Sequence, residues 1–274
     1  MQVTVFRLQD GEGTWAPLSG TWAMAEATFR FYAELNDFLP RHKRQMQFIH
    51  VFQGKPAVKD VIQSLGIPHT EVELILIDGQ PADFTSRVKD GSRVSVYPMF
   101  ESLDIEPLVR LRAHALREAT FVLDIHLGRL ARLLRLLGFD TLYRNDYDDA
   151  ELSRLSSEEH RILLTRDRGL LKRSIVSHGY CVRSSHAREQ IREVVRRFDL
   201  GRCIHPFARC LSCNGVLETV SKQAVADRLP PKVLAVQEEF KTCPQCGRVF
   251  WKGTHFARLQ GIVAIVENNT SGAW

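Results

Sequence analysis

The sequence predicts a mixed α/β chain in three successive parts, with a parallel sheet in the middle part. Residues 27–103 hold several short runs of alternating apolar and polar side chains, and residues 120–202 alternate apolar strands with helical segments. Residues 203–274 hold two Cys-x-x-Cys pairs. Repeated strand–helix units favour a parallel sheet covered by helices. Paired Cys-x-x-Cys motifs favour a small module built around a metal ion.

Composition and charge narrow the class of protein. The 274 residues are 44% hydrophobic and 25% charged, which excludes a disordered, collagen-like or mucin-like chain. The net charge of +5 is uneven: residues 1–120 hold 13 basic and 15 acidic side chains, whereas residues 201–274 hold 9 and 5. A polyanionic partner would therefore meet the later part of the chain. Neither a run of roughly 18 apolar residues nor a secretory signal is evident, so we expect a cytoplasmic protein without a membrane partner.

The first part begins with residues 1–26, an extension without clear periodicity. Alternation of apolar side chains predicts four strands, and Pro56 opens a short amphipathic helix between the second and the third. The predicted strands are Thr28–Leu35, Gln47–Phe52, Leu74–Gly79 and Arg93–Pro98. This order over residues 27–103 resembles a ubiquitin-like β-grasp domain. We interpret it as a recognition or packing module, through which a protein partner could bind.

The middle part, residues 120–202, follows a linker or short connecting helix at 104–119. Short apolar runs predict its strands, and apolar residues at helical spacing predict the helices between them. The predicted strands are Phe121–Asp124, Asp140–Arg144, Arg161–Asp167 and Tyr180–Arg183. The predicted helices are His126–Gly138, Asp149–Glu159, a segment from Arg168, and Ala187–Phe198.

Aspartates lie at the ends of these elements. Asp124 and Asp167 each end an apolar strand, and ligands of parallel sheets bind at the carboxyl ends of the strands. Clustered carboxylates repel one another unless a divalent cation neutralises them, and oxygen ligands suit Mg²⁺ or Mn²⁺. We predict Asp124, Asp149 and Asp167 as ligands of such a metal ion, with Asp140 as a fourth catalytic carboxylate. Asp149 could instead cap its helix, and Asp140 could be a turn residue.

Basic side chains surround this acidic set. Three arginines recur at three-residue spacing in the predicted helix His126–Gly138, and further cations flank Asp167. Carboxylates that hold a metal ion, beside guanidinium groups that hold phosphates, form the combination that a phosphodiesterase needs. The alternative is a solvated helix face. The candidates for contact with RNA phosphates are Arg129, Arg132, Arg135, Arg166, Arg168 and Lys172.

In combination, these runs resemble the Mut-7 C-terminal ribonuclease family over residues 119–258. The runs that carry the resemblance are Phe121–Asp124, Leu127–Asp140, Asp149–Leu152 and Arg161–Asp167. The resemblance implies a PIN-like α/β sandwich that ends in a zinc ribbon, and metal-dependent hydrolysis of RNA. Asp124, Asp149 and Asp167 match the acidic motif of the family, and Asp140 matches its Gly-Phe-Asp element. Some members carry a ubiquitin-like domain before the nuclease domain.

The cysteines of the last part predict a structural zinc site. Each Cys-x-x-Cys pair offers two sulfurs, and four thiolates close a tetrahedral Zn²⁺ site without an open position. The predicted ligands are Cys210, Cys213, Cys243 and Cys246. The gap of 29 residues between the pairs must hold an inserted helix, around Lys222–Arg228 or Val233–Phe240.

An aromatic residue and two cationic ones follow the second cysteine pair. Trp251, Lys252 and His255 lie within five residues of one another, and an aromatic ring beside cations suits single-stranded RNA. Trp251 is equally compatible with a place in a small core.

The leading hypothesis is a metal-dependent ribonuclease that acts on RNA, with a tRNA or another structured RNA among the candidate substrates. The alternative is a non-catalytic RNA-binding or adaptor protein in which the acidic residues are structural. A third hypothesis is a phosphatase or DNA nuclease that uses the same acidic site.

Overall fold

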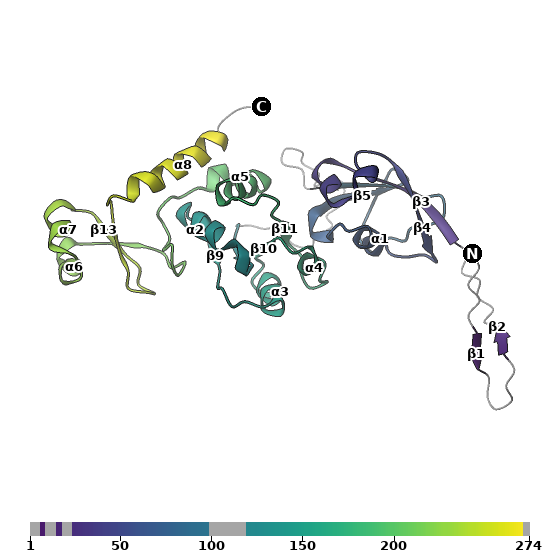
Figure 1. Ribbon diagram of the computed structural model, residues 1–274, viewed down its shortest axis with the longest axis horizontal. Helices are drawn as coiled ribbons and strands as arrows, with labels where there is room; N and C mark the ends of the chain where they lie inside the picture. Colours follow the sequence, from purple (N-terminus) through teal and green to yellow (C-terminus); the bar gives the residue numbers. More distant parts are fainter. Residues whose placement is uncertain (1–5, 9–14, 18–23, 99–118, 271–274) are drawn as a thin grey trace.

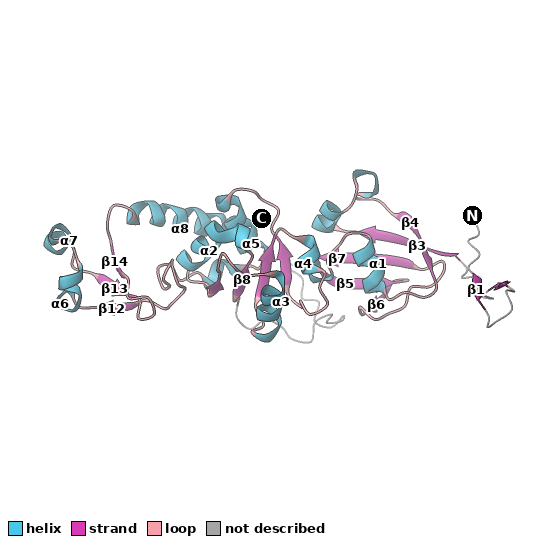
Figure 2. Cartoon of the chain, turned by 60° about the horizontal axis from the view of Figure 1, so that its bottom comes forward, coloured by secondary structure: helices cyan, strands magenta, loops and turns pink. Residues whose placement is uncertain are grey.

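The computed structural model describes residues 6–8, 15–17, 24–98 and 119–270. Within these residues, three parts follow one another in a row, each built around its own sheet (Figures 1 and 2). A separate pair of antiparallel strands, β1 (Phe6–Leu8) and β2 (Trp15–Pro17), precedes them within the predicted extension. The predicted linker at 104–119 lies, except for its last residue, outside the described residues.

The first part is a mixed five-stranded sheet with strand order β4-β3-β7-β5-β6. Its strands are β3 (Met24–Phe31), β4 (Phe48–Gln53), β5 (Val72–Ile77), β6 (Gln80–Ala82) and β7 (Arg93–Pro98). They are connected by the helix α1 (Val58–Ser64) and the 3₁₀ turns η1 (Ala33–Phe38), η2 (Arg41–Lys43) and η3 (His69–Glu71). The prediction that the first strand continues to Leu35 is wrong, because Ala33 has a φ of 44° and begins η1.

The middle part is a parallel four-stranded sheet with strand order β11-β10-β8-β9. Its strands are β8 (Phe121–Leu123), β9 (Thr141–Leu142), β10 (Ile162–Thr165) and β11 (Gly179–Cys181). Its helical segments are η4 (Ile125–Leu127), α2 (Gly128–Leu136), α3 (Asp149–Glu158), α4 (Arg168–Leu171), α5 (Ala187–Arg197) and η5 (Leu200–Cys203). Every predicted strand and helix of this part is present, and the strands are shorter than predicted.

Both faces of the parallel sheet are covered. Successive strand residues point to opposite sides, so neighbouring residues of one strand enter different cores. Phe121 and Leu123 pack against one core that includes α2, α5 and the last helix, α8 (Phe256–Thr270). Val122 and Leu163 pack on the other face with leucines of α3 and α4. That second core continues into the core of the first part, so the two sheets share one buried apolar cluster.

The last part is a three-stranded antiparallel sheet with two short helices. Its strands are β12 (Glu218–Val220), β13 (Phe240–Thr242) and β14 (Val249–Trp251), and its helical segments are α6 (Lys222–Val225), η6 (Ala226–Arg228) and α7 (Pro231–Val236). A helix does lie between the cysteine pairs at the first predicted place. The second helix ends before Phe240, which begins β13 instead.

The helix α8 was missing from our sequence prediction. It follows β14 and packs against α5 and η5, so it returns from the cysteine-containing part to the middle part (Figure 2). Val263 and Val266, three residues apart on its buried side, are the periodic signal that could have predicted it.

Candidate acidic site and cysteine cluster

Asp124 and Asp167 lie at the same edge of the parallel sheet. Strands β8 and β10 pair in parallel, with Leu123 opposite Leu164, so the residues that follow them emerge side by side. The hydroxyl of Thr165 donates a hydrogen bond to Oδ2 of Asp124 and accepts one, of 2.9 Å, from the backbone N–H of Asp167. One hydroxyl group therefore joins the two strand ends that carry these aspartates.

The carboxylate of Asp124 is buried and held by several donors. Its Oδ1 accepts a hydrogen bond of 2.7 Å from the N–H of His126, and its Oδ2 accepts one of 3.2 Å from the N–H of Arg166, besides that from Thr165. A carboxylate offers about four acceptor positions. Three donors fix the orientation of the group, and one acceptor position on Oδ1 is left without a hydrogen bond among the described residues.

Asp167 is exposed and caps the short helix α4. Its Oδ1 accepts a hydrogen bond of 2.7 Å from the N–H of Gly169. Within the part of the chain that the structure describes, Oδ2 has no hydrogen-bond partner. Capping therefore uses one oxygen of Asp167 and leaves the other one open toward solvent.

Asp149 begins α3 and faces the segment that follows Asp167. Its Oδ2 lies 3.4 Å from the guanidinium group of Arg173, just beyond α4. The residue that caps α3 is Asp148, whose Oδ1 accepts a hydrogen bond of 2.7 Å from the N–H of Glu151. The alternative interpretation of Asp149 as the helix cap is therefore wrong, and its exposed carboxylate is left for another role.

Asp140 lies at the opposite, amino-terminal end of the strands. It directly precedes β9, and its carboxylate binds Arg161 at 2.6 Å, Asn214 at 2.9 Å and Arg209 at 3.3 Å. Burial works to raise the pKa of Asp140, but these hydrogen bonds and charges outweigh it and lower the pKa below its ordinary value. This placement corrects the expectation of a fourth catalytic carboxylate: Asp140 ties the middle part to the cysteine-containing part.

The three remaining aspartates share one edge without forming a closed cluster. Across residues 24–98 and 119–267, the group of three or more metal-binding side chains whose ligand atoms all lie within 4.8 Å of one another is the four cysteines. Asp124 and Asp167 are connected through Thr165, whereas the Asp149 carboxylate pairs with Arg173. Their role as metal ligands stays a prediction.

Four of the six predicted phosphate-binding cations are exposed. Arg166 and Arg168 flank Asp167, and Arg129 and Arg132 lie on the outer side of α2, which starts four residues after Asp124. The guanidinium group of Arg168 also lies 4.8 Å from the ring centre of Phe38, in the first part.

Arg135 and Lys172 both have partners within the fold, which corrects the assignment of Arg135 to RNA, whereas the assignment of Lys172 stays a prediction. Arg135 is 3% exposed, and its guanidinium donates to the carbonyl oxygens of Thr141 at 2.9 and 3.0 Å and of Ser212 at 2.8 Å. The ammonium group of Lys172 donates to the carbonyl oxygen of Gln63 at 2.9 Å. A guanidinium saturated by backbone carbonyls holds the fold together and is out of reach of a phosphate.

A buried carboxylate joins the first two parts, and our sequence interpretation missed it. Glu71 is fully buried; its Oε1 accepts a hydrogen bond of 2.6 Å from the N–H of Cys181, and its Oε2 lies 3.4 Å from Arg183. Burial raises the pKa of Glu71, and the charges of Arg183 and Arg197 oppose this rise. The β-grasp sheet is thus packed on the β11 edge of the parallel sheet.

The four cysteines are gathered as a tetrahedral metal site requires. The Sγ atoms of Cys210 and Cys246 lie 3.6 Å apart, and those of Cys213 and Cys243 lie 3.3 Å apart. Zinc–sulfur bonds of about 2.3 Å place tetrahedral sulfurs about 3.8 Å apart, so the arrangement fits a zinc ion. Gly215 makes room for it, because a Cβ atom there would come within 2.8 Å of the sulfur of Cys243.

A helix-covered parallel sheet with carboxylates at its carboxyl edge lies between a β-grasp sheet and a four-cysteine module. This combination defines an α/β protein of three parts with an acidic site in the middle part. The chain belongs to the family described as Mut7-C RNAse domain, which matches residues 119–263. The family described as Mut7-C ubiquitin matches residues 24–104. The resemblance and the fold class predicted from the sequence are therefore confirmed, whereas the domain boundaries at residues 26, 103, 119 and 202 stay predictions.

Comparison with curated proteins and with solved structures gives no match. Among the described helices, none has the length and apolar character that would let it cross a membrane.

Proposed function

We propose that this protein is a metal-dependent ribonuclease whose acidic site lies at the carboxyl edge of the parallel sheet. The observation that carries the proposal is the Thr165 hydroxyl, which joins Asp124 and Asp167 at adjacent strand ends. Membership of an RNase family supports RNA as the substrate. A tRNA or another structured RNA stays among the candidates.

In this proposal, the ligands of Mg²⁺ or Mn²⁺ are Asp124, Asp149 and Asp167, whose carboxylate groups differ in how firmly they are held. Asp124 is fixed by three donors, whereas Asp167 and Asp149 present exposed oxygens that can adjust to a ligand. Carboxylate oxygens are the ligands that these hard cations prefer. When bound, the metal ion would neutralise the carboxylates and activate water for attack on the phosphodiester.

The exposed arginines beside this edge would orient the RNA. Arg166 and Arg168 flank Asp167, and Arg129 follows Asp124 by about one helical turn. Guanidinium groups bind phosphates through paired N–H donors, so these side chains would hold the backbone while the carboxylates hold the metal ion.

The four cysteines would hold a structural Zn²⁺, because four thiolates leave no open position for a substrate. The amide N–H of Arg248 lowers the pKa of Cys246, whereas burial raises the pKa of Cys210 and of Cys213, so zinc binding would have to displace protons from these thiols. A reducing compartment such as the cytoplasm keeps such thiols available as ligands.

The proposal is tested with Asp167→Asn and Asp124→Asn, against Asp146→Asn as a matched control. Asp146 is an exposed carboxylate that pairs with Arg144 and is not one of the three proposed metal ligands. With total cellular RNA and Mn²⁺, we expect the first two variants to lose cleavage on the order of 100-fold or more, because asparagine lacks the negative charge that would hold the metal ion. RNA affinity and the control should change little.

Two results would overturn the proposal. Cleavage that survives in Asp167→Asn and Asp124→Asn would place the activity elsewhere, and a wild-type protein that binds RNA without cutting it would favour the non-catalytic adaptor. Matched RNA and DNA oligomers separate the remaining alternative, a DNA nuclease or phosphatase, because an RNA-selective protein uses the 2′-hydroxyl.

A further inference from the structure

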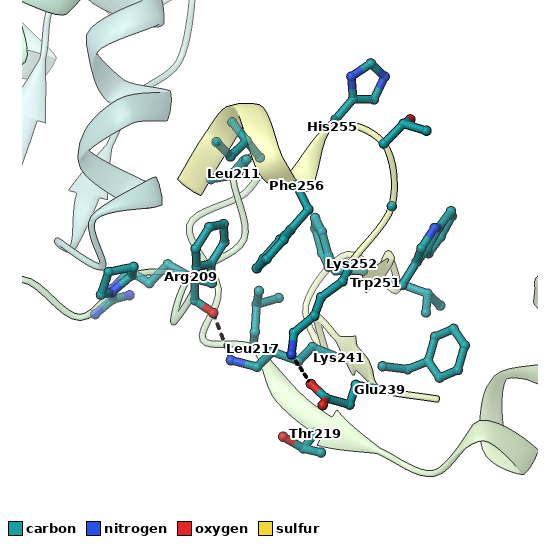
Figure 3. A pocket seen from close by; sticks show the side chains of 18 residues that line it. Arg209, Leu211, Leu217, Thr219, Glu239, Lys241, Trp251, Lys252, His255 and Phe256 are labelled. Atoms are coloured by element: carbon teal, nitrogen blue, oxygen red, sulfur yellow. Dashed lines mark hydrogen bonds and ion pairs between the residues drawn. The ribbon is translucent and has the colours of Figure 1, made fainter. Parts of the chain in front are cut away.

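The cysteine-containing part has an open groove beside its sheet. The groove has a volume of about 650 Å³ and lies between strands β13 and β14, the loop into α8 and the segment 206–211 (Figure 3). Sites for small ligands commonly span about 300–1,000 Å³. A groove of this size suits one or two nucleotides, and it is small for a folded protein.

Aromatic rings make up much of the lining. Phe207 and Phe256 lie with their ring centres 4.8 Å apart, and Phe240, which is buried, also lines the groove. Trp251 of β14 lines the groove at its edge and is 36% exposed, the lowest value among the exposed large apolar side chains of the described residues (Figure 3). An exposed indole beside a ring-lined groove offers a flat surface on which a nucleobase can stack.

Gly253 sets the position of this indole. The N–H of Gly253 donates to the carbonyl oxygen of Trp251 at 2.9 Å, which turns the chain back over the tryptophan. A Cβ atom at Gly253 would come within 2.9 Å of Nε1 of Trp251. A larger residue at position 253 would therefore displace the indole without removing it.

The charges among the lining residues favour an anionic ligand. Arg209, Lys241, Lys252 and His255 line the groove together with one carboxylate, that of Glu239. Arg209 is also held by Asp140 at 3.3 Å, and Lys241 donates to the carbonyl oxygen of Phe207 at 3.0 Å. Glu239 binds Lys252 at 2.6 Å, and both side chains are more than half exposed. An exposed ion pair contributes little to stability, so a phosphate can compete with Glu239 for Lys252.

We propose that this groove binds an unpaired nucleobase of an RNA strand, which stacks on Trp251 while Lys252 binds the adjacent phosphate. The inference rests on the proposed ribonuclease function and adds to it: the substrate would have a single-stranded segment, held on the cysteine-containing part. Aromatic lining and net positive charge together match a nucleotide better than an apolar peptide, which could not replace Glu239 as the partner of Lys252.

Binding of a short fluorescent oligouridylate without added Mg²⁺ or Mn²⁺ tests the stacking. We expect Trp251→Ala to weaken binding about 5- to 100-fold, the range that one stacked base contributes, and Trp251→Phe to restore most of it. Gly253→Val should weaken binding as Trp251→Ala does. An abasic oligomer of equal length should bind weakly, with equal affinity for the wild type and Trp251→Ala.

A matched pair of neighbouring glutamates tests how charge beside the groove affects RNA affinity. Glu238 pairs with Lys222 at 2.6 Å, as Glu239 pairs with Lys252 at 2.6 Å, but Glu238 and Lys222 do not line the groove. Removing the carboxylate beside the phosphate site should strengthen binding, so we expect Glu239→Gln to bind about two- to fivefold more tightly at low salt. Glu238→Gln should bind as the wild type does.

Lys252 and Lys222, the partners of these glutamates, form a second matched pair that tests phosphate binding. We expect Lys252→Gln to reduce the slope of log affinity against log salt by about 0.7, the value for one phosphate of a single strand. Lys222→Gln should leave the slope unchanged. A gain of affinity in Glu239→Gln would not arise from misfolding, which keeps the inference testable even where Trp251→Ala is unstable.

Unchanged RNA affinity in Trp251→Ala and Glu239→Gln would overturn the inference, and so would a wild type that does not bind the oligomer. Self-association that Trp251→Ala abolishes would assign the groove to a second copy of the chain and overturn it as well. The nuclease proposal fails separately: Asp167→Asn tests cleavage, whereas these assays measure binding alone. A protein that binds RNA through Trp251 and never cuts it would support the proposed nucleobase groove and overturn the proposed ribonuclease function.

Discussion

Gln63 and Lys172 hold each other through a reciprocal pair of hydrogen bonds. The side-chain amide of Gln63 donates to the carbonyl oxygen of Lys172 at 3.0 Å, and the ammonium group of Lys172 donates to the carbonyl oxygen of Gln63 at 2.9 Å. Gln63 lies in α1 of the β-grasp part, and Lys172 ends α4, the helix that Asp167 caps. The β-grasp part therefore supports the segment that carries one of the proposed metal ligands.

The first prediction concerns Lys172. We expect Lys172→Met to lower the free energy of unfolding by about 1 kcal/mol, the usual contribution of one hydrogen bond, and to leave the salt dependence of RNA binding unchanged. Arg166→Gln, a change at an exposed cation beside Asp167, should have the opposite pattern, with a shallower salt slope and unchanged stability. Urea titrations and RNA-binding titrations at several salt concentrations measure both. A shallower slope in Lys172→Met would show that this lysine binds RNA as the sequence predicts.

The second prediction concerns Glu71, buried between the first two parts. Removing one partner of a buried ion pair leaves the other charge uncompensated, so we expect Glu71→Ala to cost about 3–5 kcal/mol of unfolding free energy. Glu71→Gln keeps an acceptor for the N–H of Cys181 and should cost less. Hydrogen exchange at the Cys181 amide is the local measurement, and Glu26→Gln, on the exposed side of β3, is the control. Equal stability of all three variants would exclude Glu71 as the junction between the parts.

The placement of Asp124 and Asp167 could be predicted because it depends on local sequence alone. A short apolar run predicts a buried strand, and the polar residue that follows it must lie at the edge of the sheet. The two Cys-x-x-Cys pairs are equally local. Local sequence therefore places the two aspartates at strand ends and predicts the cysteine pairs as metal ligands, before any contact between distant segments is known.

Contacts between distant segments could not be predicted in this way. Arg132 and Arg135 have the same spacing pattern in α2, but only Arg135 meets the carbonyl oxygen of Ser212, far along the chain. Glu71 likewise depends on partners more than a hundred residues away. Periodicity gives the face of a helix, whereas the partner of that face depends on how the parts pack.

The third prediction uses these two arginines as a matched pair. Arg135→Ala leaves several buried carbonyl oxygens without donors, so we expect a loss of about 3 kcal/mol in unfolding free energy. Arg132→Ala, one turn earlier on the exposed side, should change stability by less than about 0.5 kcal/mol and weaken RNA binding instead. Thermal unfolding and RNA titration of both variants distinguish the roles. Stability that is equally unaffected in both would contradict the structural role of Arg135.

The fourth prediction is a pH dependence at Asp140. Its pKa in the folded protein is lowered from the ordinary value of 3.8. A carboxyl of this kind stabilises the fold above that value, and the contribution is lost as the pH falls through the lowered pKa. We therefore expect Asp140→Asn to cost about 2 kcal/mol near neutral pH, where its charge-assisted hydrogen bonds are intact, and progressively less as the pH falls below 3.8.

Urea unfolding of the wild type and Asp140→Asn across this pH range measures the difference. Asp146→Asn is the control, because Asp146 pairs with Arg144 on the exposed surface. A difference between wild type and Asp140→Asn that stayed constant down to the lowest pH would show that the ionised carboxylate is not what stabilises this junction.

The fifth prediction concerns removal of the metal ion from the four cysteines. The apolar core of the last part is small, with Val225, Leu229 and Phe240 as its buried residues, so we expect the sheet to depend on the proposed zinc ion for much of its stability. We expect a zinc chelator, or Cys243→Ser, to abolish the slow amide exchange of β13 while the β-grasp strands keep theirs. Cys203→Ser removes an exposed cysteine outside the cluster and should leave both sheets protected. Persistent protection of β13 in the chelated protein would mean that packing against the middle part, through Arg135 and Asp140, is sufficient to hold this sheet without its metal ion.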